Sequence, residues 1–311
     1  MRVGVSLRSA FGPLGGGPAD AREGARWMVE RARAAREAEL DALFVGDHHA
    51  VPAPFVYYQN VPVLGRLLAE WGDAPFGALY LLPLWHPVVV AEQVGTLAAL
   101  GTGRFVLQCA IGAGEGQFAA MGADIHRRPH AFETALGVIR RLLAGEEVTS
   151  DEGPWSIGAT RVSPVPAEPV EVWIGAAAEP AIDRAARLGD AWLAGPELTP
   201  ASAREQLGQY LGACERHGRT PTCVPIRRDV YVGETEADVA RYGAPVVAGG
   251  YRGFDPAAPV LGTVEQVADA FRVYGDLGFT DVIVRQLVED HAAAVASLRR
   301  LGEVRRLLAA R

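Results

Sequence analysis

Three consecutive residues have side chains suited to proton transfer near neutral pH. Asp47, His48 and His49 directly follow a predicted strand at residues 41–45. A histidine at a strand end is able to act as an acid or base, and an adjacent carboxylate is able to orient it or raise its pKa by charge pairing. The alternative is that one histidine caps a loop and the other is simply exposed. The chain's other histidines supply no metal-ligand spacing, so no metal site is predicted.

A glycine-rich segment follows a second predicted strand, at residues 104–111. It reads GAGEG from Gly112 to Gly116, with Glu115 as its only carboxylate. Glycines such as Gly112 and Gly114 let a flat ligand or another backbone approach closely. Glu115 is then either a functional group at a pocket rim or a solvated loop charge.

A turn of small residues links a third predicted strand, 170–174, to a helix that starts at Pro180. Free N–H groups at a helix start, together with the helix dipole, form an anion site that needs no lysine. The sequence therefore predicts phosphate binding here, with tight strand–helix packing as the alternative. The residues of this turn are Gly175, Ala176, Ala177, Ala178 and Glu179.

Eight short apolar runs, nearly all followed by a helical pattern, predict an α/β fold with a parallel sheet, because parallel strands need crossover connections. Eight such units in one domain, residues 1–311, fit a (β/α)8 TIM barrel with insertions. Two segments rich in Gly and Pro, 147–166 and 242–262, are expected to be excursions from it. A doubly wound open sheet is the alternative, but the first loop lacks the GxGxxG spacing.

Composition excludes several classes of function. All 30 basic residues among the 311 are arginine, which rules out a Schiff-base, pyridoxal-phosphate or Walker-type lysine. A net charge of −7 without a basic run argues against nucleic acid binding. Three scattered cysteines and the absence of a long apolar segment suggest a cytoplasmic chain with no membrane span.

Five segments occur in the order typical of one family, and they cover most of the chain. Together they resemble the luciferase-like monooxygenases, barrel enzymes that use a flavin or the deazaflavin coenzyme F420. The segments are FVGDHH at 44–49, LLPLWHPVVVAEQVGTLAALGTGRFVLQCAIGAGEGQF at 81–118, EGPWSIGATRVSPVP at 152–166, VWIGAAAEPAIDRAARLGDAWL at 172–193 and LGTVEQVADAFRVYGDLGFTDVIVR at 261–285.

The resemblance implies roles for individual residues. His48 matches the active-site histidine, Glu115 a catalytic carboxylate of some deazaflavin enzymes, and Gly175 to Glu179 the phosphate-binding turn. Asp47 and His49 are expected at the cofactor, and Gly112 and Gly114 would let its ring approach. The sugar-phosphate dehydrogenases of the family use lysines that this chain lacks. In the deazaflavin enzymes of the family, an aromatic residue often follows the motif that reads FVGDHH here. This chain has Val51–Ala53 in that stretch instead. Both departures favour FMN slightly over F420.

The resemblance thus predicts an oxidoreductase or monooxygenase that acts on a small organic substrate with reduced FMN or F420. One alternative is an F420-dependent dehydrogenase or reductase that transfers a hydride. Another is a flavin-binding barrel without turnover. A homodimer is expected, with a separate flavin reductase as the partner that supplies reduced flavin.

Overall fold

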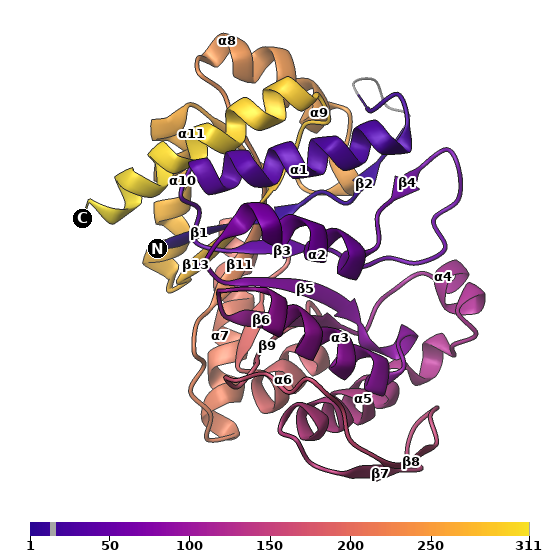
Figure 1. Cartoon of the computed structure of the whole chain (residues 1–311). Helices are drawn as coiled ribbons and strands as arrows, with labels where there is room; N and C mark the ends of the chain where they lie inside the picture. Colours follow the sequence, from indigo (N-terminus) through magenta and orange to yellow (C-terminus); the bar gives the residue numbers. More distant parts are fainter. Residues whose placement is uncertain (13–16, 311) are drawn as a thin grey trace.

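All strands of the main sheet run in the same direction. The computed structural model describes residues 1–12 and 17–310, and it places nine strands in a curled parallel sheet (Figure 1). In spatial order the sheet runs β10-β9-β6-β5-β3-β1-β13-β11-β12. Its strands are β1 (Arg2–Leu7), β3 (Leu43–Val45), β5 (Phe76–Leu81), β6 (Phe105–Ala110), β9 (Glu171–Gly175), β10 (Ala191–Leu193), β11 (Pro225–Val232), β12 (Val260–Gly262) and β13 (Asp281–Gln286).

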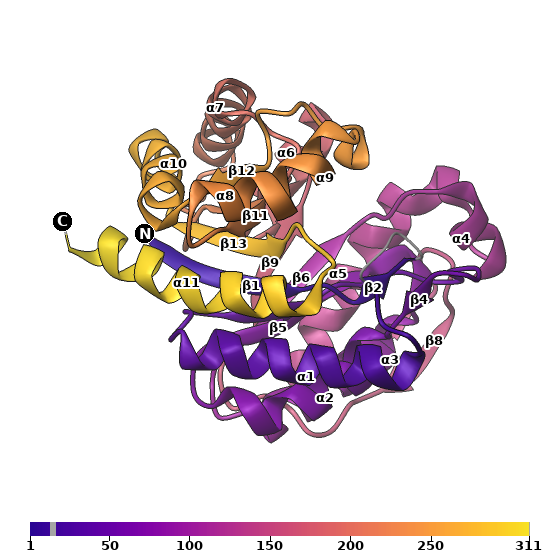
Figure 2. The same cartoon turned by 90° about the horizontal axis from the view of Figure 1, so that it is seen from above.

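Helices connect the strands and cover the outside of the sheet. Figure 2 shows α1, α2 and α3 on one side and α7 and α10 on the other. The helices between strands are α1 (Ala21–Glu37), α2 (Asn60–Trp71), α3 (Pro87–Leu100), α4 (Glu115–Ala120), α5 (Arg128–Leu143), α6 (Glu179–Leu188), α7 (Pro200–Arg216) and α10 (Val264–Leu277). The last helix, α11 (His291–Ala309), follows β13. Short 3-10 turns η1 (Leu82–Leu84) and η2 (Ile125–Arg127) precede α3 and α5. Within the described ranges, no helix has the length and apolar character needed to cross a bilayer.

The α/β fold with a parallel sheet, predicted from the alternation of strands and helices, is confirmed. The two ends of the series of strands also touch. Ala194, directly after β10, forms a parallel bridge with Ile226 on β11, with two backbone hydrogen bonds of 3.0 Å. The ninth strand, β12, pairs with the far end of β11.

Both expected excursions contain regular structure. The first holds the antiparallel pair β7 (Val148–Ser150) and β8 (Ile157–Thr160). The second begins within a short helical stretch and ends in β12. Before residue 242 the helical stretch consists of α8 (Glu236–Asp238) and the start of η3 (Val239–Gly243). Within the excursion it continues as α9 (Ala244–Ala248), which is followed by η4 (Tyr251–Gly253). A second small antiparallel pair, β2 (Ala10–Phe11) with β4 (Val56–Tyr57), lies beyond the strand ends and was not predicted.

An apolar cluster fills the inside of the curled sheet at the amino-terminal half of its strands. It contains Phe44, Val106, Trp173 and Ile283, each from a different strand and each at most 3% exposed. The rings of Phe44 and Trp173 lie 5.3 Å apart. We call this cluster the inner plug. Because side chains alternate between the two faces of a strand, the residues two positions further along also face inward, one layer higher.

Gly77 on β5 is a position where the sheet leaves no room for a side chain. A Cβ atom there would lie 2.0 Å from the Val106 carbonyl oxygen and 3.1 Å from the Phe44 ring. We expect Gly77→Ala to lower the free energy of unfolding by roughly 1–3 kcal/mol, because the sheet and the inner plug must shift to accept the methyl group. Urea unfolding measures this change.

The matched control is Gly208→Ala on the exposed face of α7, where a Cβ atom meets nothing within 4 Å. This change should stabilise the protein by about 0.5–1 kcal/mol, because alanine is a better helix former than glycine. Equal effects of the two substitutions would contradict the close approach at Gly77.

Candidate active site

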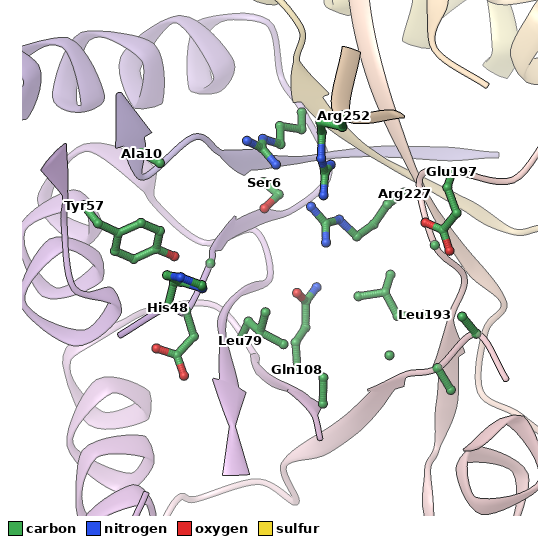
Figure 3. Close-up of a pocket in the computed structure, with 18 of the residues that line it drawn as sticks. Ser6, Ala10, His48, Tyr57, Leu79, Gln108, Leu193, Glu197, Arg227 and Arg252 are labelled. Atoms are coloured by element: carbon green, nitrogen blue, oxygen red, sulfur yellow. The ribbon is translucent and has the colours of Figure 1, made fainter. Parts of the chain in front are cut away.

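A cavity of about 630 Å³ opens directly above the inner plug, at the carboxyl ends of the strands (Figure 3). Four of its lining residues lie two positions after the four plug residues named above. They are Gly46, Gln108, Gly175 and Arg285. The layer that follows the apolar plug is therefore made of small or polar residues. The change from apolar to small or polar side chains takes place over two residues of each strand. It separates the packed core from the space that is available to a ligand.

His48 forms one wall of this cavity. In Figure 3 it lies beside Tyr57, and the centroids of the two rings are 5.8 Å apart. The His48 side chain is exposed, and its carbonyl oxygen accepts a hydrogen bond of 3.1 Å from Gln59 Nε2. Partial burial lowers the pKa of His48 below its ordinary value, and the nearby Asp47 carboxylate only partly opposes this effect. Burial at this position therefore favours the neutral form of the imidazole.

Asp47 joins the loop after β3 to the end of β5. Its Oδ2 accepts hydrogen bonds of 2.8 Å from the Leu81 backbone N–H and from Trp85 Nε1. Its Oδ1 lies 3.3 Å from His49 Nε2, and the carboxylate is fully buried. Although Asp47 belongs to the cavity wall, its charge is thus directed into the protein and fixes the loop that carries His48.

His49 points away from the cavity, because its direction alternates with that of His48. It is 7% exposed and packs edge-on against Trp85, with 5.1 Å between ring centroids. The two adjacent histidines therefore have different environments. His48 lines the cavity, and His49 packs behind Asp47.

The turn after β9 brings Gly175, Ala176 and Ala177 to the cavity, while Ala178 and Glu179 are exposed beyond it. Ala178 is the N-cap of α6, and its carbonyl oxygen accepts from the N–H groups of Ala181 and Ile182. Over residues 1–12 and 17–310, the N–H groups of Ala177 and Ala178 donate to no backbone oxygen. They are available to an anion placed at this turn.

Glu115 lies away from the cavity. It is the first residue of α4 and is exposed, and none of Gly112, Gly114 and Glu115 lines the cavity. Gly112 and Gly114 have φ angles of +72° and +87°, which only glycine adopts easily. These glycines turn the chain outward into α4, so the structure does not bring Glu115 next to His48.

Gln108 carries a polar group without a partner into the cavity. It lies on β6 and is 4% exposed, and in the described part of the chain its Nε2 has no hydrogen-bond partner. In Figure 3 its amide points toward the centre of the cavity. A buried donor of this kind costs free energy unless a ligand accepts from it.

The opposite wall contains arginines from three separate elements. Arg227 comes from β11, Arg285 from β13 and Arg252 from η4, so the excursion at 242–262 contributes to the cavity. Glu197, which follows β10, is the acidic residue on this side of the cavity (Figure 3). No group of three or more His, Cys, Asp or Glu side chains suited to a metal ion occurs in the described ranges.

Comparison with known proteins relates this geometry to a family. The family model described as luciferase-like monooxygenase matches residues 1–259. This chain belongs to the luciferase-like monooxygenase family. The resemblance drawn from the five sequence segments is thereby confirmed. His48 lies within the matched region, as do the other residues that line the cavity except Arg285.

Curated relatives of the chain are F420-dependent glucose-6-phosphate dehydrogenases. The one from Beutenbergia cavernae is 32% identical over 174 residues, which are 51% of this chain and 49% of that protein. The one from Microbacterium testaceum is 28% identical over 233 residues, 68% of this chain and 67% of that protein. The matched region thus spans about half to two thirds of the length of these relatives.

Solved structures share the fold at lower identity. An F420-dependent secondary alcohol dehydrogenase in complex with an F420-acetone adduct matches with a TM-score of 0.80 and 14% identity, over 99% of this chain and 98% of that one. The oxygenating constituent of 3,6-diketocamphane monooxygenase from Pseudomonas putida, in complex with FMN, matches with a TM-score of 0.75 and 15% identity, over 97% of both chains. The fold is therefore found in proteins with either cofactor.

Sequence reasoning missed several of the cavity residues. Phe55 and Tyr57 line the cavity, although the stretch Val51–Ala53 before them lacks an aromatic residue, and Tyr57 belongs to β4. Its hydroxyl oxygen would lie 3.1 Å from a Cβ atom at Gly46, so a glycine at position 46 makes room for it. The sequence signal was the run FVYY, which the strand–helix alternation did not include.

The protonation of His48 provides a test of this geometry. We expect a pKa below the ordinary value of about 6.5, because burial disfavours the imidazolium more than Asp47 favours it. Since the unfolded chain would bind this proton more readily, the contribution of His48 to stability should fall as the pH drops through about 6.5. NMR titration of the histidine ring signals, assigned with His48→Gln, measures the pKa. A value above 6.5 would show instead that the Asp47 charge dominates.

Proposed function

We propose that this protein is a redox enzyme that binds F420 or FMN in the cavity above the inner plug, with His48 as its proton-transferring residue. The observation that carries the proposal is the position of His48 on the wall of a cavity formed by the strand ends, where burial also lowers the pKa of its imidazole. The family membership supports the class of reaction. We also propose that the eight strands other than β12 form a closed barrel, which the Ala194–Ile226 bridge supports.

The residues on one side of the cavity fit a flat ring. Two glycines leave space there, Gly46 in the loop after β3 and Gly175 at the end of β9. The polar side chains beside them are Ser6 from β1 and Gln108 from β6. The unpartnered Gln108 Nε2 is a donor for a ring oxygen or nitrogen. The turn from Ala176 to Glu179 would hold the cofactor phosphate through backbone N–H groups, an arrangement that needs no lysine.

Either cofactor, when bound, supplies the redox chemistry by exchanging a hydride equivalent, and reduced FMN also reacts with oxygen. The task left to the protein is proton transfer. His48 in its neutral form is able to accept the proton of a substrate hydroxyl while the carbon that bears this hydroxyl is oxidised. Asp47 holds the loop that carries His48 in place during this step. This favours hydride transfer from an alcohol, with oxygenation as the second candidate.

The relatives in sequence bear on the choice of cofactor. Both that we compared are F420-dependent by name, which favours F420 and reverses the slight preference for FMN that the missing lysines suggested. The homodimer, the separate flavin reductase and the small organic substrate remain predictions.

Cofactor binding tests the phosphate turn. We expect Ala177→Asp to weaken binding of F420, or of FMN if that is the cofactor, at least tenfold, because it places bulk and negative charge among the N–H groups of the turn. Titration of the protein with each cofactor, followed by absorption, measures the affinity. Ala201→Asp, at an exposed site on α7, is the control of equal charge and should bind normally. Equal cofactor affinity of the two variants would show that the phosphate does not bind at this turn. If the wild type bound neither F420 nor FMN, the proposed function would be overturned.

Turnover tests the role of His48. We expect His48→Gln to bind the cofactor nearly normally and to react about 10²–10⁴-fold more slowly, because it lacks a general acid or base. The measurement is the change in cofactor absorbance with a panel of alcohols. His126→Gln, exposed on η2, is the control. Wild-type rates in His48→Gln would make His48 a loop residue, and no reaction in any variant would favour the barrel without turnover.

A further inference from the structure

Within the part of the chain that the structure describes, two arginines of the cavity wall have no partner for their charge. Arg227 and Arg285 lie on the adjacent strands β11 and β13 and both face the cavity. Across the described ranges of the chain, neither guanidinium makes a hydrogen bond or has a carboxylate oxygen within 4.0 Å, and the Nε atom of each is buried without a partner. Both side chains are half-buried. A charge that is partly removed from water normally has a counter-charge, since this removal is costly.

The neighbour Arg228 shows how the same strand treats a structural arginine. Its side chain faces the opposite side of β11, is fully buried, and is surrounded by acceptors. Nη2 donates to the Gly195 carbonyl oxygen at 2.8 Å, and Nη1 donates to the Tyr274 hydroxyl at 2.8 Å and to the Leu198 carbonyl oxygen. Where the fold itself needs a guanidinium, it supplies the acceptors. At Arg227 and Arg285 it supplies none.

The acidic groups near this wall do not neutralise it. Asp229 is fully buried and is the register partner of Arg285, but it pairs with Arg252 Nη1 at 2.9 Å. Glu197 forms no ion pair within 4.0 Å in the described part of the chain, and its carboxylate folds back over Gly195. Two guanidinium charges without an ion pair in the described ranges therefore remain above the apolar inner plug. Burial and the charge of Arg285 together lower the pKa of Arg227 to about 10.

The arginines share their cavity with His48. Tyr57 contacts the His48 ring and also lies close enough to Arg285 and Arg227 for their charges to oppose the rise that burial causes in its pKa. Figure 3 shows Arg227 and Arg252 across the cavity from Tyr57 and His48. A molecule held by the arginines therefore extends toward His48.

We propose that Arg227 and Arg285, with Arg252 at the rim, form a subsite that binds an oxyanion group of the substrate, a carboxylate or a phosphate. The inference rests on the proposed function, because it assumes that the cofactor's own phosphate is held at the turn after β9. Guanidinium groups match the planar geometry of carboxylate and phosphate oxygens. The anchored anion would place a neighbouring carbon of the substrate beside His48.

The test measures anion binding without any turnover. Inorganic phosphate and malonate are titrated into the full-length wild type and into Arg227→Gln and Arg285→Gln, followed by calorimetry and by thermal unfolding. Each variant should bind the anion about 10- to 100-fold more weakly, because it loses charge-assisted hydrogen bonds. Preference for phosphate or for malonate then identifies the class of oxyanion.

Arg204→Gln, exposed on α7, is the control of equal charge and should bind like the wild type. Without anion, Arg285→Gln should melt at the same or a higher temperature than the wild type, because it removes a like charge from Arg227. With phosphate, the wild type should gain thermal stability and this variant should not. This opposite pattern separates the proposal from a simple loss of folding.

Cofactor titration of the same variants separates the two proposals. Unchanged affinity for F420 and FMN in Arg227→Gln and Arg285→Gln assigns the subsite to the substrate, as proposed. An equal loss of cofactor affinity would overturn the inference by assigning the arginines to the cofactor. Equal anion binding in the wild type, Arg285→Gln and Arg204→Gln would overturn it as well, while leaving the proposed function to its own tests.

Discussion

The common direction of the strands determines where this protein is able to do chemistry. Parallel pairing sets the carboxyl ends of β1, β3, β5, β6, β9, β10, β11 and β13 at one edge of the sheet. The alternation of side chains then fixes two successive layers inside it. The lower layer is the inner plug, and the next residues of the same strands line the cavity. A ligand site results because, two positions after each of the four named plug residues, the inward-facing residue is small or polar instead of apolar.

Asp47 shows how one buried carboxylate supports a neighbouring group. Its two hydrogen bonds to Leu81 and Trp85 connect the loop after β3 to the next strand, so His48 is held at the cavity without using its own ring for the purpose. His49 fills the space behind this carboxylate. The three residues that read as one catalytic cluster in the sequence thus divide into an anchor, a cavity residue and a packed ring.

Every lysine or arginine position of the chain is an arginine, so the positive charge on this wall of the cavity comes from arginine side chains. Arg228 is satisfied by carbonyl and hydroxyl oxygens of its own chain, whereas Arg227, one residue earlier, faces the cavity without such partners. The excursion from 242 to 262 adds Arg252 and holds it through Asp229. An insertion that looked peripheral in the sequence therefore contributes a side chain to the wall opposite His48.

The sequence by itself determined the succession of elements and their fold class. The strands predicted at 41–45, 104–111 and 170–174 agree with β3, β6 and β9 to within two residues at each end, and the helix predicted from Pro180 begins at Glu179. The agreement arises because apolar runs and flanking Gly or Pro are local signals. The motif that ends in His48 and the small-residue turn were also recognisable, since both directly follow a strand. Residues on strand ends are therefore the part of a site that a sequence of this kind predicts well.

Only the tertiary structure decided which of these groups share a cavity. In the run Arg227-Arg228-Asp229 every residue is polar, so alternation alone does not say which side chains face inward, and pairing with β13 settles it. Glu115 follows a strand end just as His48 does, yet two glycines with positive φ carry it outward into α4. Tyr57 on β4 and Arg252 on η4 reach the cavity from segments outside the main sheet, whose paths depend on long-range packing. Local sequence fixes the elements, but the direction of a loop and the inward face of a polar strand are set by contacts between residues far apart in the chain.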